Sequence, residues 1–185
     1  MRKQNPEAVV REVTGYLDLS IASVEVARLG LRMFRERLLR QPPADSNPDP
    51  MIYIGAGDPD HPSTVPTTAV RRSALLSDTA RQARVEVELG QQWIVATYSR
   101  WEKHFRPGIA RSLGVRSEDV VIPLFGDLRR LRHDVVHHLG TATAEWSGRC
   151  ELLPALAENE RIEVGDPEFR LIREAWAASA SELSA

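Results

Sequence analysis

The chain has 185 residues, of which 42% are hydrophobic, with 24 basic and 26 acidic side chains and a net charge of −2. This length and composition predict one domain, residues 1–185, with a substantial hydrophobic core. The near balance of charge excludes the overall cationic field of a general nucleic-acid binder, so any contact with a polyanion has to be local.

The single cysteine and the hydropathy pattern narrow the expected location of the protein. Cys150 alone excludes an internal disulfide framework. The charged N-terminal sequence lacks the pattern of a secretory signal, and no apolar run approaches the roughly 20 residues of a membrane-spanning helix. We therefore expect a soluble cytoplasmic protein without a membrane partner.

The first 40 residues predict one long helix, or two helices broken near Ser20. No proline interrupts the chain between Pro6 and Arg40, and apolar side chains recur there at helical spacing. Residues 41–67 hold seven of the twelve prolines and predict a long proline-rich loop. Loops of this length are either functional or mobile, and we favour a mobile one.

The rest of the chain also predicts mainly helices. A second long helix is expected over Ala69–Phe105, ending before Pro107 because the residue preceding a proline avoids helical angles. A shorter helix follows over 123–140, and a final one over 168–183. We therefore predict an all-α antiparallel bundle, with either a short two-stranded excursion or irregular chain near 149–165.

A basic cluster in the shorter helix is the main chemical feature of the sequence. Its basic side chains are Arg129, Arg130, Arg132, His133, His137 and His138. On a helix, His133 and His137 stand one above the other, and Arg132 lies on the adjoining edge, about 140° from His137 by the 3.6-residue period. One face therefore offers a guanidinium and two imidazoles.

This combination suits cleavage of RNA by internal attack of a 2′-hydroxyl, which needs a base, an acid and a fixed cation. Arginine grips a phosphate with two hydrogen bonds, and histidine exchanges protons near neutral pH. Asp134 stands where it can orient His137 or His138. Arg129 and Arg130 are candidates for binding the substrate, and this chemistry requires no metal or cofactor.

Two other interpretations use the same residues. His133 and His137 have the spacing of two metal ligands, although zinc needs a third ligand and the usual glutamate of zinc hydrolases is missing. Alternatively, the arginines are solvated charges that pair with Asp127 or Asp134, and the histidines are favoured at a helix end by the dipole.

The segment Arg132-His133-Asp134-Val135-Val136-His137 is similar to the signature of the HEPN superfamily (higher eukaryote and prokaryote nucleotide-binding domains). That signature is an arginine, a polar residue, three further residues and a histidine. The wider run from 126 to 140, Gly-Asp-Leu-Arg-Arg-Leu-Arg-His-Asp-Val-Val-His-His-Leu-Gly, resembles the form D-L-R-x-x-R-N-D-I-V-H-H-x-G of many bacterial members. The expected helical bundle agrees with the fold of the family.

The resemblance implies a metal-independent endoribonuclease of a toxin, defence or stress system, with Arg132 and His137 acting directly and His133 supporting them. It also implies a homodimer in which two such helices build one cleft, and a possible antitoxin or regulatory partner. Toxins of the family that are silenced by nucleotide transfer carry a tyrosine at the position of Gly140, so that control is not expected here. The alternative is a noncatalytic module that binds nucleotide or RNA, because some members have lost catalysis.

Overall fold

The computed structural model describes residues 5–55, 61 and 65–184. The chain divides into two compact units, one of residues 1–25 and 87–185 and the other of residues 26–86. Helices account for most of the described chain, and none of the described helices is long and apolar enough to cross a membrane. The predicted all-α class is therefore confirmed.

Helix α1, Pro6–Arg40, is the longest element and is unbroken, as the first of the two sequence interpretations has it. Asn5 Oδ1 accepts the backbone N–H of Glu7 at 3.1 Å and so caps a helix end that leaves amide groups unpaired. No break occurs at Ser20, whose hydroxyl instead accepts the indole N–H of Trp93 at 2.9 Å.

The predicted second helix is divided into α2, Arg72–Asp78, and α3, Arg84–Arg100, and it does not end before Pro107. A π-helix, η1, over Trp101–Phe105 continues α3, and α4 follows over Arg106–Leu113. The backbone N–H of Arg106 bonds to the carbonyl of Trp101, five residues back. This wider turn accommodates Pro107, which lacks an N–H and would crowd a regular α-helix.

A two-stranded antiparallel sheet lies in the second unit, where the sequence predicted a loop and the start of a helix. Strand β1, Met51–Ile54, pairs with β2, Thr68–Arg71, with Met51 opposite Arg71. The β-branched and aromatic side chains of these strands favour pairing, but the surrounding prolines obscured that signal. Residues 56–60 and 62–64, within the predicted mobile loop, lie outside the described residues.

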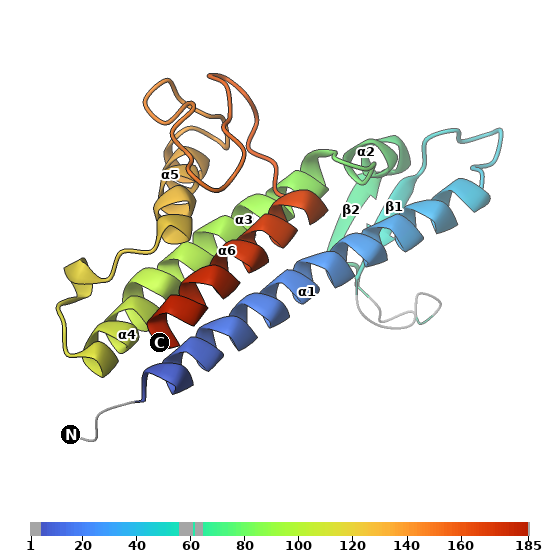
Figure 1. The fold of residues 1–185 in the computed structure, drawn as a ribbon. Helices are drawn as coiled ribbons and strands as arrows, with labels where there is room; N and C mark the ends of the chain where they lie inside the picture. The colour runs from blue at the N-terminus through green and yellow to red at the C-terminus, as the bar shows by residue number, and fades with distance from the viewer. Residues whose placement is uncertain (1–4, 56–60, 62–64, 185) are drawn as a thin grey trace. The chain divides into compact units, whose positions relative to one another are not determined.

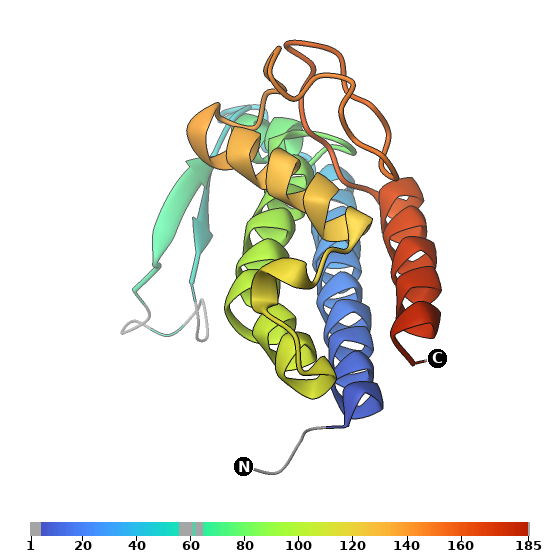
Figure 2. The ribbon, with the colours of Figure 1, turned by 60° about the vertical axis from the view of Figure 1, so that its left-hand side comes forward.

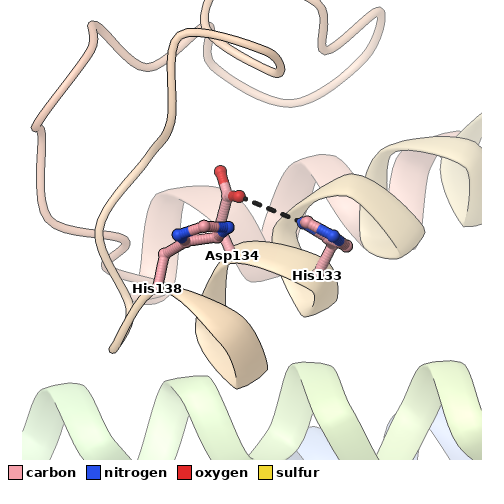
Figure 3. Close-up of side chains that lie close together, drawn as sticks. All are labelled: His133, Asp134 and His138. Carbon is pink, nitrogen blue, oxygen red and sulfur yellow. Dashed lines mark hydrogen bonds and ion pairs between the residues drawn. The ribbon is translucent and has the colours of Figure 1, made fainter.

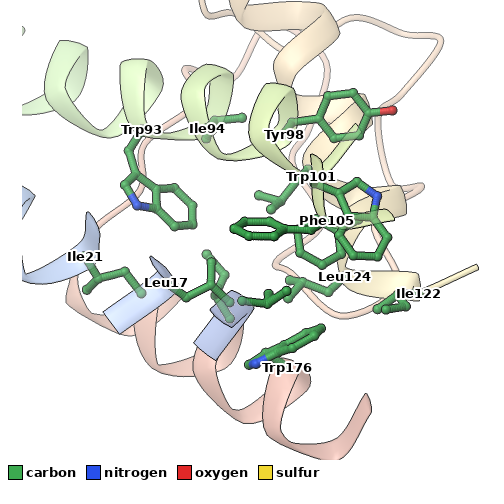
Figure 4. Close-up of a cluster of buried hydrophobic side chains, with 14 of the residues drawn as sticks. Leu17, Ile21, Trp93, Ile94, Tyr98, Trp101, Phe105, Ile122, Leu124 and Trp176 are labelled. Carbon is green, nitrogen blue, oxygen red and sulfur yellow. The ribbon is translucent and has the colours of Figure 1, made fainter. Parts of the chain in front are cut away.

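The first unit contains the hydrophobic core. Within it, α3 and the C-terminal helix α6, Asp166–Ser184, run antiparallel to the first part of α1, as Figures 1 and 2 show. Figure 4 shows aromatic side chains filling the space between these helices, including Trp93, Trp101 and Trp176. Burying one such side chain contributes about 1.5–3 kcal/mol relative to exposing it, so this cluster fixes the bundle.

Helix α5, Pro123–His137, crosses α3 at a steep angle in both views of the fold (Figures 1 and 2). Its Phe125 stacks on Trp101 with ring centroids 3.8 Å apart, which ties α5 to the core. A short 3-10 turn, η2, Ser117–Asp119, precedes it. The 138–165 segment that follows contains no strand, only a single bridge between Thr141 and Arg161, so the irregular alternative for 149–165 is confirmed.

Candidate functional site

Helix α5 presents two sides of different chemistry. Its buried side chains are Leu124, Phe125, Asp127, Leu128, Leu131 and Asp134. Its outer arc, exposed or half-buried, carries Arg129, Arg130, Arg132, His133, Val136 and His137. Both carboxylates of the helix therefore lie on the buried side, and every titratable side chain on the outer arc is basic.

Asp127 anchors the irregular chain at the N-terminal half of α5. Its fully buried carboxylate accepts the backbone N–H groups of Glu151 at 3.0 Å, Leu152 at 2.8 Å and Leu153 at 3.0 Å. The guanidinium of Arg130 pairs with the same carboxylate at 2.8 Å. All of the bonding capacity of Asp127 is therefore used inside the protein.

Asp134 has the corresponding role in the C-terminal half of the helix. Its carboxylate, 2% exposed, accepts the backbone N–H of Thr143 at 2.9 Å and the Thr143 hydroxyl at 3.0 Å. Its Oδ1 also lies 3.4 Å from Nδ1 of His133. The threonine thus fixes the orientation of the carboxylate beside the imidazole.

The tautomer of His133 follows from its other neighbour, Trp146. The indole N–H of Trp146 points at Nδ1 of His133 at 3.2 Å. Because an indole N–H only donates, Nδ1 is the acceptor, and the proton of the neutral ring is assigned to Nε2. In this tautomer Nδ1 has no proton to give Asp134, so the 3.4 Å approach is a contact rather than a hydrogen bond.

Three imidazoles gather at the C-terminal end of α5. The ring of His133 lies 4.9 Å from that of His137 and 5.5 Å from that of His138, measured between centroids. His137 and His138 are exposed, whereas Asp134 between them and the core is buried. Figure 3 shows His133 and His138 on either side of the Asp134 carboxylate.

The chain turns sharply after the histidines. Leu139 and Gly140 both have left-handed backbones, with φ of 54° and 75°. A Cβ at Gly140 would collide with the side-chain amide of Gln91, so only glycine fits there without displacing that side chain. The turn brings Thr143 back to Asp134.

An open hollow of about 380 Å³ lies beside this turn. It is lined by His137, His138, Leu139, Thr141, Ala142, Thr143, Ala144, Glu158 and Asn159. Two imidazoles therefore border a space that can admit a ligand.

The arginines differ in what already binds them. Arg130 bridges Asp127 and, at 3.5 Å, Glu151. Arg129 and Arg132 form no ion pair with any residue that the structure describes, and the buried Nε of Arg132 has no hydrogen-bond acceptor there. These two guanidinium groups consequently retain capacity for an external anion.

Two other titratable groups near α5 are held neutral. Burial raises the pKa of the Tyr98 hydroxyl on α3 above its ordinary value, with Glu102 adding to the effect and Arg129, Arg106 and Arg132 opposing it. Burial, followed by the charge of Asp127, raises the pKa of the Cys150 thiol to about 11. A thiol with this pKa is a poor nucleophile at neutral pH, which fits the absence of any motif around it.

The sequence-predicted residues thus fall into three groups. The structure brings His133, His137, His138 and Asp134 together at the end of α5. It leaves Arg129 and Arg132 on the outer arc without partners among the described residues, whereas it engages Arg130 with Asp127. No direct contact joins Arg132 to His137 among the interactions of the described chain.

Sequence reasoning missed two residues that shape the site, Thr143 and Trp146. Both lie in irregular chain beyond α5, where no sequence periodicity indicates which side chains fold back to contact the helix. Sequence reasoning also missed a third metal-ligating side chain. Ligand atoms of His133, Asp134 and His138 lie within 4.8 Å of one another, so His138, rather than His137, completes the set.

Comparison with known proteins adds no relative. No protein-family model, curated protein or solved structure matches the chain. Functional inference for this chain therefore rests on the residues of α5 and on their surroundings.

Proposed function

We propose that this chain is an endoribonuclease that cleaves RNA through attack of a 2′-hydroxyl, with Arg132, His133 and His137 at its site. The observation that carries the proposal is the outer arc of α5, on which every titratable side chain is basic, while Asp127 and Asp134 are buried. A helix face without carboxylates of its own favours a polyanion, and exposed imidazoles add groups that move protons.

The groups divide the chemistry as follows. Arg132 pairs with the phosphate and stabilises the negative charge that grows on it. His133 donates its Nε2–H to a phosphate oxygen, because its Nδ1 already accepts the Trp146 indole. The exposed His137 takes the proton of the 2′-hydroxyl as the new bond to phosphorus forms.

The leaving 5′-oxygen needs a proton as its bond to phosphorus breaks, and a second imidazole must supply it. In the proposed homodimer this group is the partner's His137, so the site is built from two copies of α5. The exposed apolar side chains beside the histidines support such contact, with Val136 45% and Leu139 95% exposed. The products are a 2′,3′-cyclic phosphate and a 5′-hydroxyl.

The test is incubation of the full chain with total RNA in a chelating buffer. We expect cleavage by the wild type and by the control His104→Ala, whose histidine pairs with Glu12 outside α5. His137→Ala and Arg132→Ala should each lose about 10²–10⁴-fold in rate. Cleavage that persists in both variants overturns the proposal.

Mixing the wild type with His137→Ala tests the composite site. If each site needs both copies, activity falls with the square of the wild-type fraction, whereas independent sites give a linear fall. If RNA protects α5 from hydrogen exchange but is not cleaved, the result favours a noncatalytic binding module instead.

The proposal also includes a biological context for the ribonuclease, which is a toxin, defence or stress system in which an antitoxin or other regulator controls it.

A further inference from the structure

The group formed by His133, Asp134 and His138, at the end of α5, offers a donor set for a metal ion, and the proposed cleavage of RNA uses only His133 of the three. It consists of two imidazoles and one carboxylate, with one ligand atom of each lying within 4.8 Å of the others. Figure 3 shows the two rings directed toward the carboxylate from opposite sides. Imidazole and carboxylate together suit zinc and its first-row neighbours rather than magnesium or calcium.

One separation in this group already matches a zinc site. Nδ1 of His133 and Oδ1 of Asp134 are 3.4 Å apart. Two ligand atoms bound to zinc at about 2.0–2.1 Å, with a tetrahedral angle between them, are also about 3.4 Å apart. The distance is long for a hydrogen bond, and the assigned tautomer excludes one.

The surroundings hold the buried ligand in place. Thr143 donates two hydrogen bonds to Asp134, and each carboxylate oxygen keeps a further lone pair. Such outer partners orient the ligands of many metal sites. His138 is exposed, so its ring is free to adjust to a bound ion, and the fourth position can take a water.

We propose that His133, Asp134 and His138 bind one zinc ion per chain and that zinc inhibits the site. The inhibitory effect rests on the proposed function. Zinc on Nδ1 of His133 takes the lone pair that the Trp146 indole uses, so binding breaks that hydrogen bond. The imidazole is then fixed by the ion and can no longer turn its Nε2–H toward the phosphate.

The binding test uses the full chain without a polyhistidine tag, titrated with zinc chloride by calorimetry in the absence of RNA. We expect one zinc per chain in the wild type and in His104→Ala, and affinity lower by about tenfold or more in His138→Ala. Circular dichroism checks that each variant is folded. A wild type that binds no zinc, or a His138→Ala variant that binds it equally well, overturns the proposal.

Tryptophan fluorescence reports the displacement itself. Zinc should change the emission of the wild type, and this change should be absent in Trp146→Phe, which lacks the indole N–H. An equal change in both variants contradicts displacement of Trp146.

Rates of RNA cleavage with and without zinc test inhibition. The ratio of the two rates should fall in the wild type and stay near one in His138→Ala. Because binding is measured without RNA, failure of the ribonuclease proposal leaves the zinc result interpretable. Bound zinc that leaves the wild-type rate unchanged overturns inhibition alone.

Discussion

Each half of α5 contains one buried aspartate, and the two aspartates have different roles. In each half a buried aspartate holds irregular chain against the helix, Asp127 through the backbone of 151–153 and Asp134 through Thr143. The first carboxylate has a guanidinium and three amide groups around it, so nothing remains for a ligand. The second has two imidazoles beside it, one of them exposed. A buried acid can therefore serve purely as an anchor or also prepare a site, depending on which side chains border it.

The largest expected effect is that of Asp127→Ala. Removing this buried carboxylate takes the acceptor from Arg130 and from three amide groups, of which that of Leu153 is buried, so we expect a loss of about 3–5 kcal/mol in the free energy of unfolding. Urea denaturation followed by circular dichroism measures it. Glu145→Ala, an exposed acid in the same irregular segment, is the control and should change stability by less than about 0.5 kcal/mol. Similar values for the two variants would refute the anchoring role.

The turn beyond the histidines is the next most sensitive point. Gly140→Ala adds left-handed strain and forces Gln91 away from the carbonyl of Ile162, which it binds at 3.1 Å. We expect a loss of about 2–3 kcal/mol. Gly148→Ala is a matched control, because its φ is 68° but a Cβ there meets nothing within 4 Å. The free energy of unfolding of Gly148→Ala should fall by only about 1 kcal/mol. Equal losses in the two variants would show that Gln91 moves aside at no cost, which would contradict the prediction.

Thr143→Val should have a smaller effect on stability and a specific one on the site. Valine keeps the backbone bond to Asp134 but loses the hydroxyl bond, at a cost of about 1.5–2 kcal/mol. If zinc binds as proposed, its affinity should also fall about 10–100-fold, because the carboxylate loses part of its orientation. Calorimetry compares the zinc affinity of this variant with that of the control Thr141→Val, and so separates the role of Thr143 at the site from its role in stability. Unchanged zinc affinity in Thr143→Val would remove the threonine from the site.

The sequence identified the long first helix of this arrangement, but not the two-stranded sheet or the continuation of the helix past Pro107. Helix α1 is found from Pro6 to Arg40 because no proline interrupts its apolar spacing. The continuation past Pro107 was hidden, since a π-turn leaves no mark in that spacing. The β1–β2 pair was hidden by the prolines around it.

The same division holds at the candidate site. The basic arc of α5 follows from the helical period, and so does the proximity of His133 to His137. The contacts of Thr143 and Trp146 depend on how chain beyond a glycine turn folds back, which no local pattern encodes. The third metal ligand was missed for a related reason, because His138 lies just past the helix, where the 3.6-residue period ceases to apply.

The smallest expected effect is that of Glu151→Gln, which tests whether the exposed Glu151 side chain adds to the anchoring role of the buried Asp127. Glu151→Gln removes the 3.5 Å ion pair with Arg130 but keeps the backbone N–H that binds Asp127. Because the Glu151 side chain is 61% exposed, water screens this pair, and its loss should cost less than about 0.5 kcal/mol. Urea denaturation alongside Asp127→Ala measures the difference. A loss comparable to that of Asp127→Ala would mean that the ion pairs of Arg130 with both carboxylates are needed for stability. The exposed Glu151 would then hold the irregular chain against α5 together with the buried Asp127.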